Sequence, residues 1–409
     1  MKRMGWLVLF LFGLSGAACA CSSAVISGRV TLDGRPLLWK NRDTRKMENH
    51  ARFFTGEKYN FIGVIHTDDV EGNEIWMGSN SAGFSIMNTA AFNLGMGEGY
   101  KGPKDQEGFM MKAALERCAT LADFETLLEE MAGPRGANSN FGVIDARGGA
   151  AYYEVGPETH EKYDVNDPKQ APSGYLIRTN FGFSGTNAKG SAYIRYQTVD
   201  DLFFYSVLHD RLTPEFLLID ASRCLKHSLL GHDWRSAEWP DSREQTQYIV
   251  MRGYVVRYTS VSAIVIQGVK PGENPDRTTL WTMPGFPLTS LTVPLWVAAG
   301  EDLPRCVAST DGAPAPLSTN SLALKEQCFP LHFRDGGDYL DLAVVLNKQG
   351  DGILQKILPQ EREIIERTNE LQDGWNAEGF NRAEARRHYR WLDKTIEDFY
   401  KREFGLGEK

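Results

Sequence analysis

Several patterns that mark common protein classes are missing from this sequence. It holds no internal repeat, no Walker loop and no dinucleotide fingerprint, so no nucleotide cofactor is expected. Its N-terminal apolar run is too short for a membrane-spanning helix, which needs about 20 predominantly apolar residues. Basic residues are outnumbered, and the net charge of −8 argues against nucleic acid and against an anionic membrane surface as partners.

The spacing typical of metal ligands is missing as well. His227 and His232 lie five residues apart around Gly231, which is typical of a helix end rather than of a ligand pair. We therefore expect no zinc site and no other cofactor. The His residues are His50, His66, His160, His209, His227, His232, His332 and His388.

What the chain does contain begins with a segment that is typical of a signal peptide. Residues 1–3 are a short basic start, residues 6–12 are apolar, and residues 18–20 form an Ala-x-Ala cleavage signature. Cleavage after Ala20 would leave a mature chain that starts with Cys21 and, without Lys2 and Arg3, carries a net charge of −10. The sequence therefore predicts an extracytoplasmic protein, with residues 1–20 removed.

A cysteine at the first position has a chemical consequence. A free α-amine titrates near about pH 7.7–8.0, so it can serve as the general base for its own residue's thiol. Two alternatives stay open: a plain secreted protein, and a lipoprotein acylated on Cys19 or Cys21. A lipobox has a large aliphatic residue three places before the cysteine, where this chain has Gly16 and Ala18.

The residues after Cys21 predict a β-hairpin. Residues 22–31 are rich in β-branched and small residues, residues 33–36 are a turn, and residues 36–42 form a second strand. The second strand runs back toward the chain start. Asp43 is therefore expected near the α-amine, where its carboxylate can accept a charge-assisted hydrogen bond.

This arrangement of Cys21, a turn and Asn41-Arg42-Asp43 resembles the N-terminal nucleophile hydrolases. The resemblance is to the choloylglycine hydrolase and penicillin V acylase group and to the related acyl-CoA:6-aminopenicillanic acid acyltransferases. That group has Arg-Asn-x-Asp here, with the Arg near the thiol and the Asp on the α-amine. This chain has Lys40 in place of the Arg. We expect Arg42 on the opposite strand face, where it would be a poor substitute.

Three further residues correspond to active-site positions of the resembled group. Asn88 ends the strand that follows an Asn-x-x-Gly segment, and Asn180 ends a strand in Thr-Asn. The resemblance implies that both contribute to the oxyanion hole, where a neutral amide stabilises negative charge without titrating. Arg195 follows a Ser-rich helix start and corresponds to an active-site Arg. As alternatives, the two Asn residues cap turns and Arg195 is a solvated helix charge. Asp145 and Glu154 are interpreted as hairpin residues.

Five cysteines would remain after cleavage. In an oxidising compartment one nucleophile and two pairs are permitted. Cys306 and Cys328 bracket a Pro- and Ser-containing loop and form the expected disulfide. Cys118 and Cys224 fall in helical patterns and are expected to be buried free thiols.

The pattern of elements predicts a mixed α/β chain, and the resemblance implies a four-layer αββα sandwich for residues 21–350. Strands are expected at 60–68, 73–79, 83–89, 140–146, 150–156, 174–180, 247–258, 261–269, 278–283 and 291–298. Helices are expected at 105–118, 121–132, 191–208 and 214–229.

Residues 351–409 change in composition and predict a helical hairpin. Long amphipathic helices are expected at 354–371 and 382–404, with the turn near Asp373-Gly374. Ile357, Leu358, Ile364 and Ile365 on the first helix, and Trp391, Ile396 and Phe399 on the second, are expected to pack on the domain. A homo-oligomer interface through these helices is the alternative.

Taken together, the sequence predicts a secreted N-terminal-cysteine amidase or acyltransferase that cleaves a linear amide C–N bond in a small-molecule or peptide-like substrate. The rival within the class is a dipeptidase whose chain begins Cys-Ser or Cys-Thr. The rival from another class is a lipid-anchored binding protein of the same fold, which would meet a membrane only through its lipid.

Overall fold

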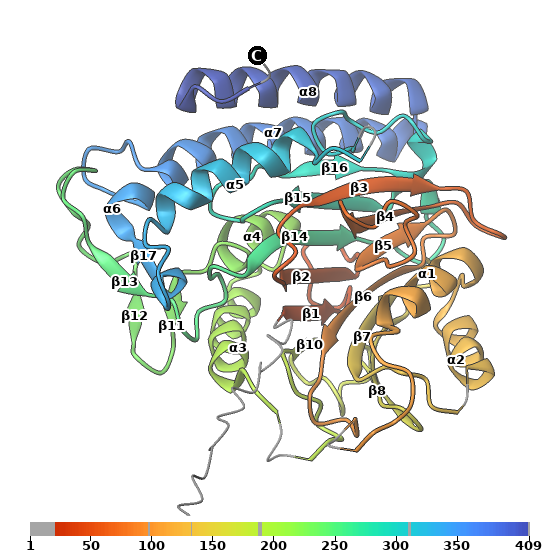
Figure 1. The fold of residues 1–409 in the computed structure, drawn as a ribbon. Helices are drawn as coiled ribbons and strands as arrows, with labels where there is room; N and C mark the ends of the chain where they lie inside the picture. Colours follow the sequence, from red (N-terminus) through yellow and green to blue (C-terminus); the bar gives the residue numbers. More distant parts are fainter. Residues whose placement is uncertain (1–20, 97–98, 132, 187–189, 310–311, 408–409) are drawn as a thin grey trace, which may run out of the picture.

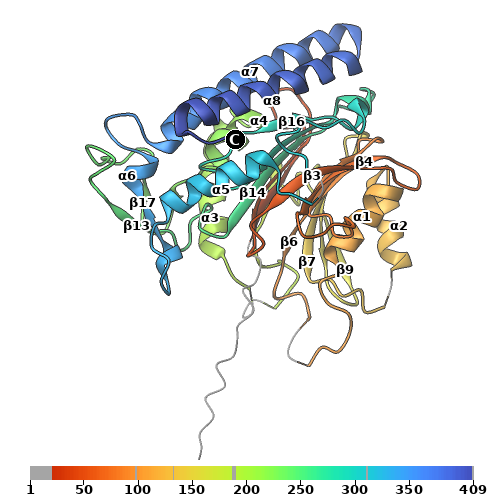
Figure 2. The same cartoon turned by 45° about the horizontal axis from the view of Figure 1, so that its top comes forward.

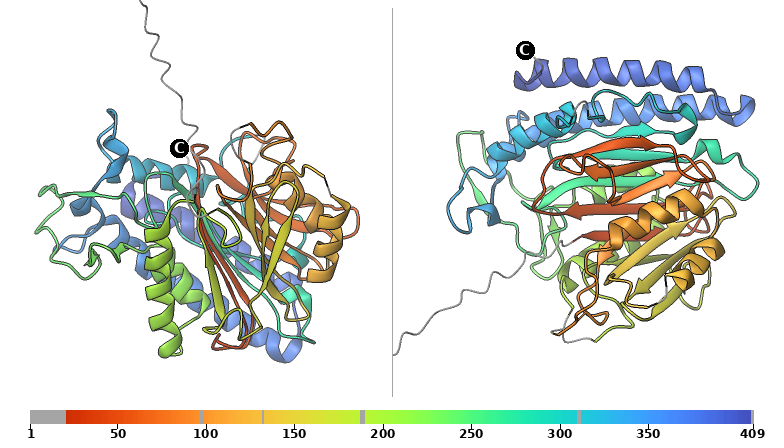
Figure 3. Two further views of the ribbon diagram at one scale, coloured as in Figure 1. Left: turned by 90° about the horizontal axis from the view of Figure 1, so that it is seen from below. Right: turned by 45° about the vertical axis from the view of Figure 1, so that its right-hand side comes forward.

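A computed structural model describes residues 21–96, 99–131, 133–186, 190–309 and 312–407. The predicted leader, residues 1–20, lies outside the described residues. Two antiparallel sheets face each other, and helices cover their outer faces (Figure 1). The four-layer αββα arrangement is therefore confirmed. Figure 3 shows the layers edge-on, with α3 on one side of the sheets and α1 and α2 on the other.

The first sheet carries both strands of the predicted hairpin. Its order is β10 (Tyr175–Arg178), β1 (Ser22–Ile26), β2 (Leu37–Asp43), β14 (Ser260–Gln267), β15 (Thr279–Pro284) and β16 (Val293–Leu295). β1 is thus an inner strand, hydrogen-bonded to a neighbouring strand on each side. Inner strands with both faces covered are expected to read as continuous buried runs, and every residue of β1, β2 and β14 is buried.

The second sheet is a meander that follows the chain order. It contains β3 (Asn49–Phe54), β4 (Phe61–His66), β5 (Met77–Asn80), β6 (Ser85–Ala90), β7 (Ser139–Ile144), β8 (Ala150–Val155) and β9 (His160–Asp164). Val25 and Leu38 of the first sheet pack with Met87 and Tyr152 of the second in the core between the sheets.

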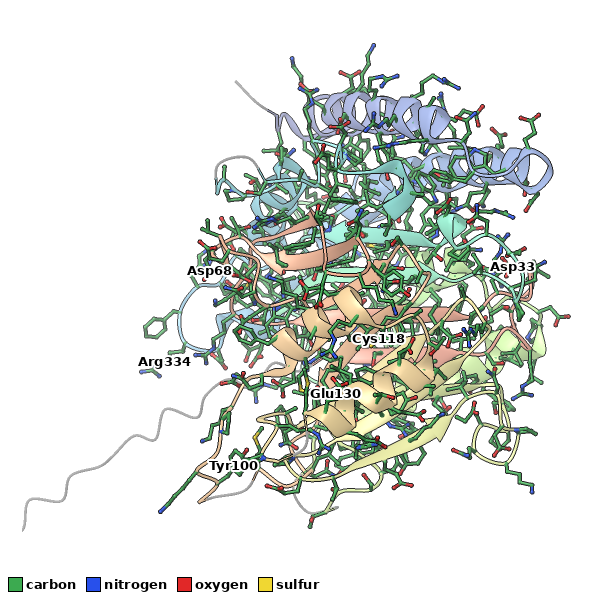
Figure 4. All side chains as sticks on the ribbon, turned by 90° about the vertical axis from the view of Figure 1, so that its right-hand side faces the viewer. Asp33, Asp68, Tyr100, Cys118, Glu130 and Arg334 are labelled. Carbon is green, nitrogen blue, oxygen red and sulfur yellow. The ribbon has the colours of Figure 1, made fainter. Side chains whose placement is uncertain are left out.

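Two helix layers close the outer faces. α1 (Glu107–Arg117) and α2 (Leu121–Glu130) pack on the second sheet through a cluster that includes Cys118, which Figure 4 shows beside these helices. α3 (Tyr193–Leu208), α4 (Pro214–Phe216) and the π-helical turn Leu217–Ala221 pack on the first sheet. The remaining elements are the strand pairs β11 (Lys226–His227) with β12 (His232–Asp233) and β13 (Tyr248–Val250) with β17 (Tyr339–Asp341), and the short helix α6 (Leu342–Val345).

The C-terminal part adds α5 (Pro316–Cys328), α7 (Ile353–Glu378) and α8 (Arg382–Phe404). Figure 2 shows α7 and α8 side by side along one edge of the molecule. The residues predicted to face the domain are buried or partly buried in its clusters, namely Ile357, Leu358, Ile364, Ile365, Trp391, Ile396 and Phe399.

A buried ion pair fastens α7 to the first sheet. Arg223 donates to Glu361, to two main-chain oxygens that follow β15 and to the oxygen of Leu218, and neither charged side chain is exposed. Glu361 also accepts a hydrogen bond from the main-chain nitrogen of Thr292. All three guanidinium nitrogens and both carboxylate oxygens of the pair are thus hydrogen-bonded within the protein.

The predicted helix over 214–229 was wrong beyond residue 221. Asn41 donates its side-chain amide to the main-chain oxygen of Ser222, and the indole of Trp39 donates to the hydroxyl of the same residue. That oxygen is therefore bound by β2 instead of continuing a helical ladder. The chain leaves the helix and forms β11.

Three further predictions about elements were wrong. The turn between the last helices lies at Gly379, which has a φ of 83°, and Gly374 is inside α7. Strands β3 and β9 were missed. Residues 316–328 form α5 instead of a loop.

The expected disulfide was also wrong, because all five described cysteines are free. Leu317 donates its main-chain nitrogen to Cys306, so Cys306 lies at the start of α5 and Cys328 at its end. Eleven residues of helix span about 17 Å, and a disulfide needs Cα atoms within about 7 Å. Cys118 and Cys224 are buried and free, as predicted.

We expect Arg223→Met to lower the free energy of unfolding by about 3–5 kcal/mol, because Glu361 would stay buried without its cation. Arg117→Met is the control: it breaks the exposed pair with Glu130, which water screens, and should lower the free energy of unfolding far less. Urea unfolding of both variants measures the difference. Equal midpoints would contradict a stabilising role for the buried pair.

Candidate active site

Cys21 lies at the start of an inner strand, where two neighbouring strands end. β1 pairs with β2 at Ser22 opposite Asn41, and with β10 at Ser23 opposite Arg178. Continuing the first register by one residue and the second by two places Cys21 between Arg42 at the end of β2 and Asn180 just after β10. Its side chain is 4% exposed.

The direction of the Cys21 side chain follows from the alternation along β1. Val25 belongs to the core between the sheets, and the hydroxyl of Ser23 lies 2.7 Å from that of Tyr152 in the second sheet. Residues two apart in a strand share a face, so Cys21 shares this inner face. Ser22 points the other way, toward α3.

Arg195 of α3 holds the chain start from that outer side. Its Nη1 donates to the Cys21 carbonyl oxygen at 2.7 Å and to the Ser22 hydroxyl at 2.8 Å. Its Nη2 donates to Asn180 Oδ1 at 2.5 Å. Burial, followed by the charge of Arg257, lowers the pKa of Arg195 to about 9, so the guanidinium stays charged at neutral pH. The alternative of a solvated helix charge is therefore wrong.

A strained turn sets the position of α3. Ala192, the residue before the helix, has a φ of 71°, which is uncommon for a residue with a side chain. Its carbonyl accepts a hydrogen bond from the Thr179 hydroxyl, and Ser191 forms a bridge with Asn180. These contacts join the first turn of α3 to the end of β10, which brings Arg195 to Asn180.

Lys40 and Asn88 meet on the inner face. The fully buried Lys40 ammonium donates to Asn88 Oδ1 and to the Trp76 carbonyl oxygen, each at 2.9 Å. The amide nitrogen of Asn88 donates to the Ser139 hydroxyl at 3.1 Å. Lys40 thus occupies the inner face that Cys21 shares, and it fixes which way the Asn88 amide is turned.

The expectation for Arg42 was wrong. Arg42 and Lys40 are two residues apart in β2 and therefore share the inner face. Arg42 donates to Asn49 at 2.6 Å and lies 2.7 Å from His66 Nε2. Burial, with the nearby cations, lowers the pKa of His66 to about 2, so this imidazole is neutral and accepts the hydrogen bond. Arg42 is therefore a second buried cation on this face, and continuing the register of β1 with β2 places it opposite Cys21.

Asp43 is bound by two groups that lie more than 200 residues further along the sequence. Arg257 Nη2 donates to Oδ2 at 2.5 Å, and the Ser260 hydroxyl donates to Oδ1 at 2.6 Å. A register shift between Ser260 and Ser262 marks a β-bulge in β14 at this point. The expected contact of Asp43 with the α-amine stays a prediction, because Ala20 is outside the described residues.

Arg257 and Ser260 were not identified from the sequence. Arg257 lies in a segment that was predicted as an ordinary strand, and no motif surrounds it. The signal that existed was indirect: a carboxylate on a strand with both faces covered must have a cation or several donors. Which of the chain's Arg residues supplies that cation depends on tertiary packing.

Asn180 is held in position at both ends of its amide. Its Oδ1 accepts from Arg195, and its Nδ2 donates to the Ala90 carbonyl oxygen at 2.9 Å. Asn180 is therefore tied to Cys21 through Arg195, whereas Asn88 is bound by Lys40, and neither simply caps a turn.

Asp145 and Glu154 have the structural roles that were expected of them. Asp145 accepts main-chain hydrogen bonds within its own hairpin and from Leu121. Glu154 is buried in an ion pair with Arg178 and also accepts from the main chain of Phe183 and Ser184. It fixes the segment that follows Asn180.

The charges around Cys21 are predominantly positive. One carboxylate, that of Asp43, and four cationic side chains from three parts of the chain lie near the start of β1 and the end of β2. An excess of positive charge in a water-poor site stabilises an anion, whether a thiolate or an oxyanion. The four cations are those of Lys40, Arg42, Arg195 and Arg257.

Neither a metal site nor a membrane span was found in the part of the chain that the structure describes. No group of three or more His, Cys, Asp or Glu residues there is arranged to hold a metal ion. None of the helices there is both long and apolar enough to cross a bilayer.

Comparisons with known proteins bear on the family. Three solved structures are similar in part. The N-acylethanolamine-hydrolyzing acid amidase ortholog of Caenorhabditis elegans has a TM-score of 0.31 and 16% identity over 46% of this chain and 85% of that one. A variant of the conjugated bile acid hydrolase of Clostridium perfringens has a TM-score of 0.39 and 11% identity over 68% of this chain and 93% of that one. Penicillin V acylase of Agrobacterium tumefaciens has a TM-score of 0.34 and 11% identity over 69% of this chain and 87% of that one.

The comparison with curated protein sequences gave no match. A family model does match: residues 30–202 correspond to the acyl-coenzyme A:6-aminopenicillanic acid acyl-transferase family. That segment contains Asp43, Asn88, Asn180 and Arg195. The resemblance of this chain to the N-terminal nucleophile hydrolases, through its acyl-transferase branch, is thereby confirmed.

Proposed function

We propose that the mature chain is an extracytoplasmic N-terminal nucleophile amidase or acyltransferase that starts at Cys21 and cleaves a linear amide C–N bond. One observation carries the proposal: Arg195 binds the Cys21 carbonyl, the Ser22 hydroxyl and the Asn180 amide together. A catalytic residue at the start of a chain needs contacts that fix its position, and the buried Arg195 guanidinium supplies them to Cys21 and Ser22.

In the first half of the reaction the α-amine of Cys21 accepts the thiol proton, and Sγ attacks the substrate carbonyl carbon. The carbonyl π electrons move to the oxygen, which becomes an oxyanion. When the tetrahedral intermediate collapses, the C–N bond breaks and the α-ammonium gives its proton to the leaving amine. A thioester on Cys21 remains.

In the second half a water molecule or a second amine attacks the thioester carbonyl while the α-amine takes its proton. The C–S bond breaks, the thiol is restored, and an acid or a new amide leaves. Water gives a hydrolase and an amine gives an acyltransferase. Nothing in either half requires an imidazole base.

The surrounding groups have distinct roles in this scheme. Asn180 and the Asn88 region stabilise the oxyanion, and Lys40 supplies the cation that the resembled group takes from Arg. Asp43 orients the α-amine, and Arg257 positions Asp43. Arg195 keeps Cys21 and Asn180 in register.

Two other candidates are distinguished by direct measurement. A dipeptidase would prefer unblocked dipeptides to N-acyl amides in a substrate panel. A lipid-anchored binding protein would show a diacylglyceryl adduct in the intact mass of the secreted chain, whereas the enzyme would show an unmodified chain beginning at Cys21. We also propose that a homo-oligomer, if one forms, uses the surface of α7 and α8.

Cys21→Ala should abolish turnover while secretion and the unfolding midpoint persist. Cys21→Ser should leave at most a trace, because a hydroxyl is a far weaker nucleophile than a thiol. A panel of N-acyl amino acids, conjugated bile acids, penicillin V and dipeptides identifies the responding substrate. Cys118→Ala is the matched control, since this buried thiol is remote in sequence and packs under α1 and α2. A Cys21→Ala enzyme with wild-type rates would refute the mechanism.

One extra residue before Cys21 should make the enzyme nearly inactive, because the base becomes an amide that cannot accept a proton. Asp43→Asn should weaken activity without erasing it, since the amine survives and only its orientation is lost. His66→Ala and the other single His replacements should retain catalysis per folded molecule. The rates of the extended chain, of Asp43→Asn and of the His variants, normalised by active-site titration, distinguish an α-amine base from a His base. Full activity of the extended chain, together with loss in one His variant, would instead indicate a His-based cysteine hydrolase.

Arg257→Met should lower kcat by about 10-fold or more with little change in KM, because Arg257 positions Asp43 and does not contact substrate. Arg257→Lys keeps a cation at this place and should recover part of the loss. An increase in KM alone would contradict the positioning role and place Arg257 in the substrate pocket.

A further inference from the structure

The strand that ends at Asn180 has an open edge. β10 is the terminal strand of the first sheet and pairs only with β1 among the described strands. β9 is the terminal strand of the second sheet on the same side of the sandwich, and Tyr163 of β9 lies against Arg178 of β10. Two sheet edges thus meet at one side of the molecule.

The main-chain groups of β10 that face this edge follow from the register. Ser27 donates its main-chain nitrogen to Gly174, so the directly opposed pairs that include Leu176 and Arg178 bond to β1. The main-chain groups of Tyr175 and Ile177 therefore point away from β1. In agreement, the Ile177 oxygen accepts a hydrogen bond from the Arg178 guanidinium at 2.9 Å.

A groove of about 300 Å³ runs along this edge. All four residues of β10 form its floor. One wall is α3 with Tyr196, and the other is the edge of the second sheet with Tyr163. Phe183, which is half-exposed, closes the end nearest Asn180.

The contents of the groove favour an uncharged extended chain. Arg178 is neutralised by Glu154, and its guanidinium is stacked on the rings of Tyr152, Tyr163 and Phe183. The groove therefore offers main-chain donors and acceptors along its floor and mainly aromatic side chains along its walls, with one carboxylate, Asp200, which accepts a hydrogen bond from the Tyr175 hydroxyl. This is the combination by which a sheet edge binds a peptide strand.

The end of the groove that Phe183 closes lies beside the candidate active site. Asn180 follows the floor strand by two residues and is held by the same Arg195 that holds Cys21. A chain laid along four residues of β10 spans about 13 Å and reaches the end of the strand where Asn180 lies. Binding energy from that remote part of a substrate can be used to position the scissile amide.

We propose that this groove binds the substrate as an added β-strand, so that the enzyme acts on extended peptide-like amides that carry apolar side chains. The inference rests on the proposed function, because it assigns a substrate class to the same site. The alternate amides of the substrate bond to Tyr175 and Ile177. One apolar side chain packs against Leu176 and Phe183.

Substrate length and N-methylation test the added strand. N-acyl dipeptide, tripeptide and tetrapeptide amides with leucine side chains should rise in kcat/KM by at least about 10-fold along the series. N-methylation of one alternating set of amides in the tetrapeptide should lower kcat/KM by about 5-fold per amide, the equivalent of one hydrogen bond, and the other set should tolerate it. Equal kcat/KM values for all substrate lengths, or equal effects of N-methylation in both sets of amides, would overturn substrate binding in the groove but would not contradict the proposed amidase activity.

Two Phe→Ala variants test whether Phe183 contacts the bound substrate in the groove. Phe183→Ala should raise KM for the tetrapeptide several-fold with kcat unchanged, and Phe109→Ala, an equally exposed ring on α1, should change neither. Calorimetric titration of the tetrapeptide into the Cys21→Ala protein measures binding without turnover, so it distinguishes a failed groove from a failed mechanism. Absence of binding there would overturn the groove. A dimer in sedimentation that Phe183→Ala dissociates would also overturn it, since a second copy would then occupy the edge.

Discussion

The contact on which the candidate site depends is the buried guanidinium of Arg195. It links the chain start to the end of β10 and to the first turn of α3, through one carbonyl, one hydroxyl and one amide oxygen. Taking such a cation out of water is costly unless its donors are bound. These acceptors come from two segments, residues 21–22 and Asn180, and neither segment alone satisfies the cation. The charge therefore enforces the geometry that brings Cys21 to Asn180.

A second group of charges surrounds this contact and divides the site into two faces. Lys40 and Arg42 lie on the face between the sheets, whereas Asp43 and its partner Arg257 lie on the face toward α3. The alternation of β2 makes this division unavoidable, since consecutive side chains point to opposite sides. β2 thus supplies Lys40 and Arg42 to the face that Cys21 shares, and Asp43 to the face toward α3.

The sequence was informative where its pattern is local. The hairpin after Cys21, the strands of the second sheet and α2 with its Thr120 cap were visible in alternation and capping signals. α5 was not, because its first turn is rich in Ser, Thr and Asn, and its stability comes from Leu317 and Leu324 in the core. Recognisable sequence motifs surround four of the site residues, namely Cys21, Asn88, Asn180 and Arg195. Arg257 carried none, since its role depends on a partner more than 200 residues away.

The fastening of α7 has a consequence for how the chain is made. Glu361, on the helix that binds Arg223 and joins the core between the sheets, is synthesised 138 residues after Arg223. Residues 21–350 therefore cannot finish packing during synthesis, because Arg223 has no carboxylate partner until Glu361 has emerged. Cys21 and β1 are thus made well before the helix that closes the core. The order of the elements along the chain therefore delays completion of the core relative to synthesis of the candidate site.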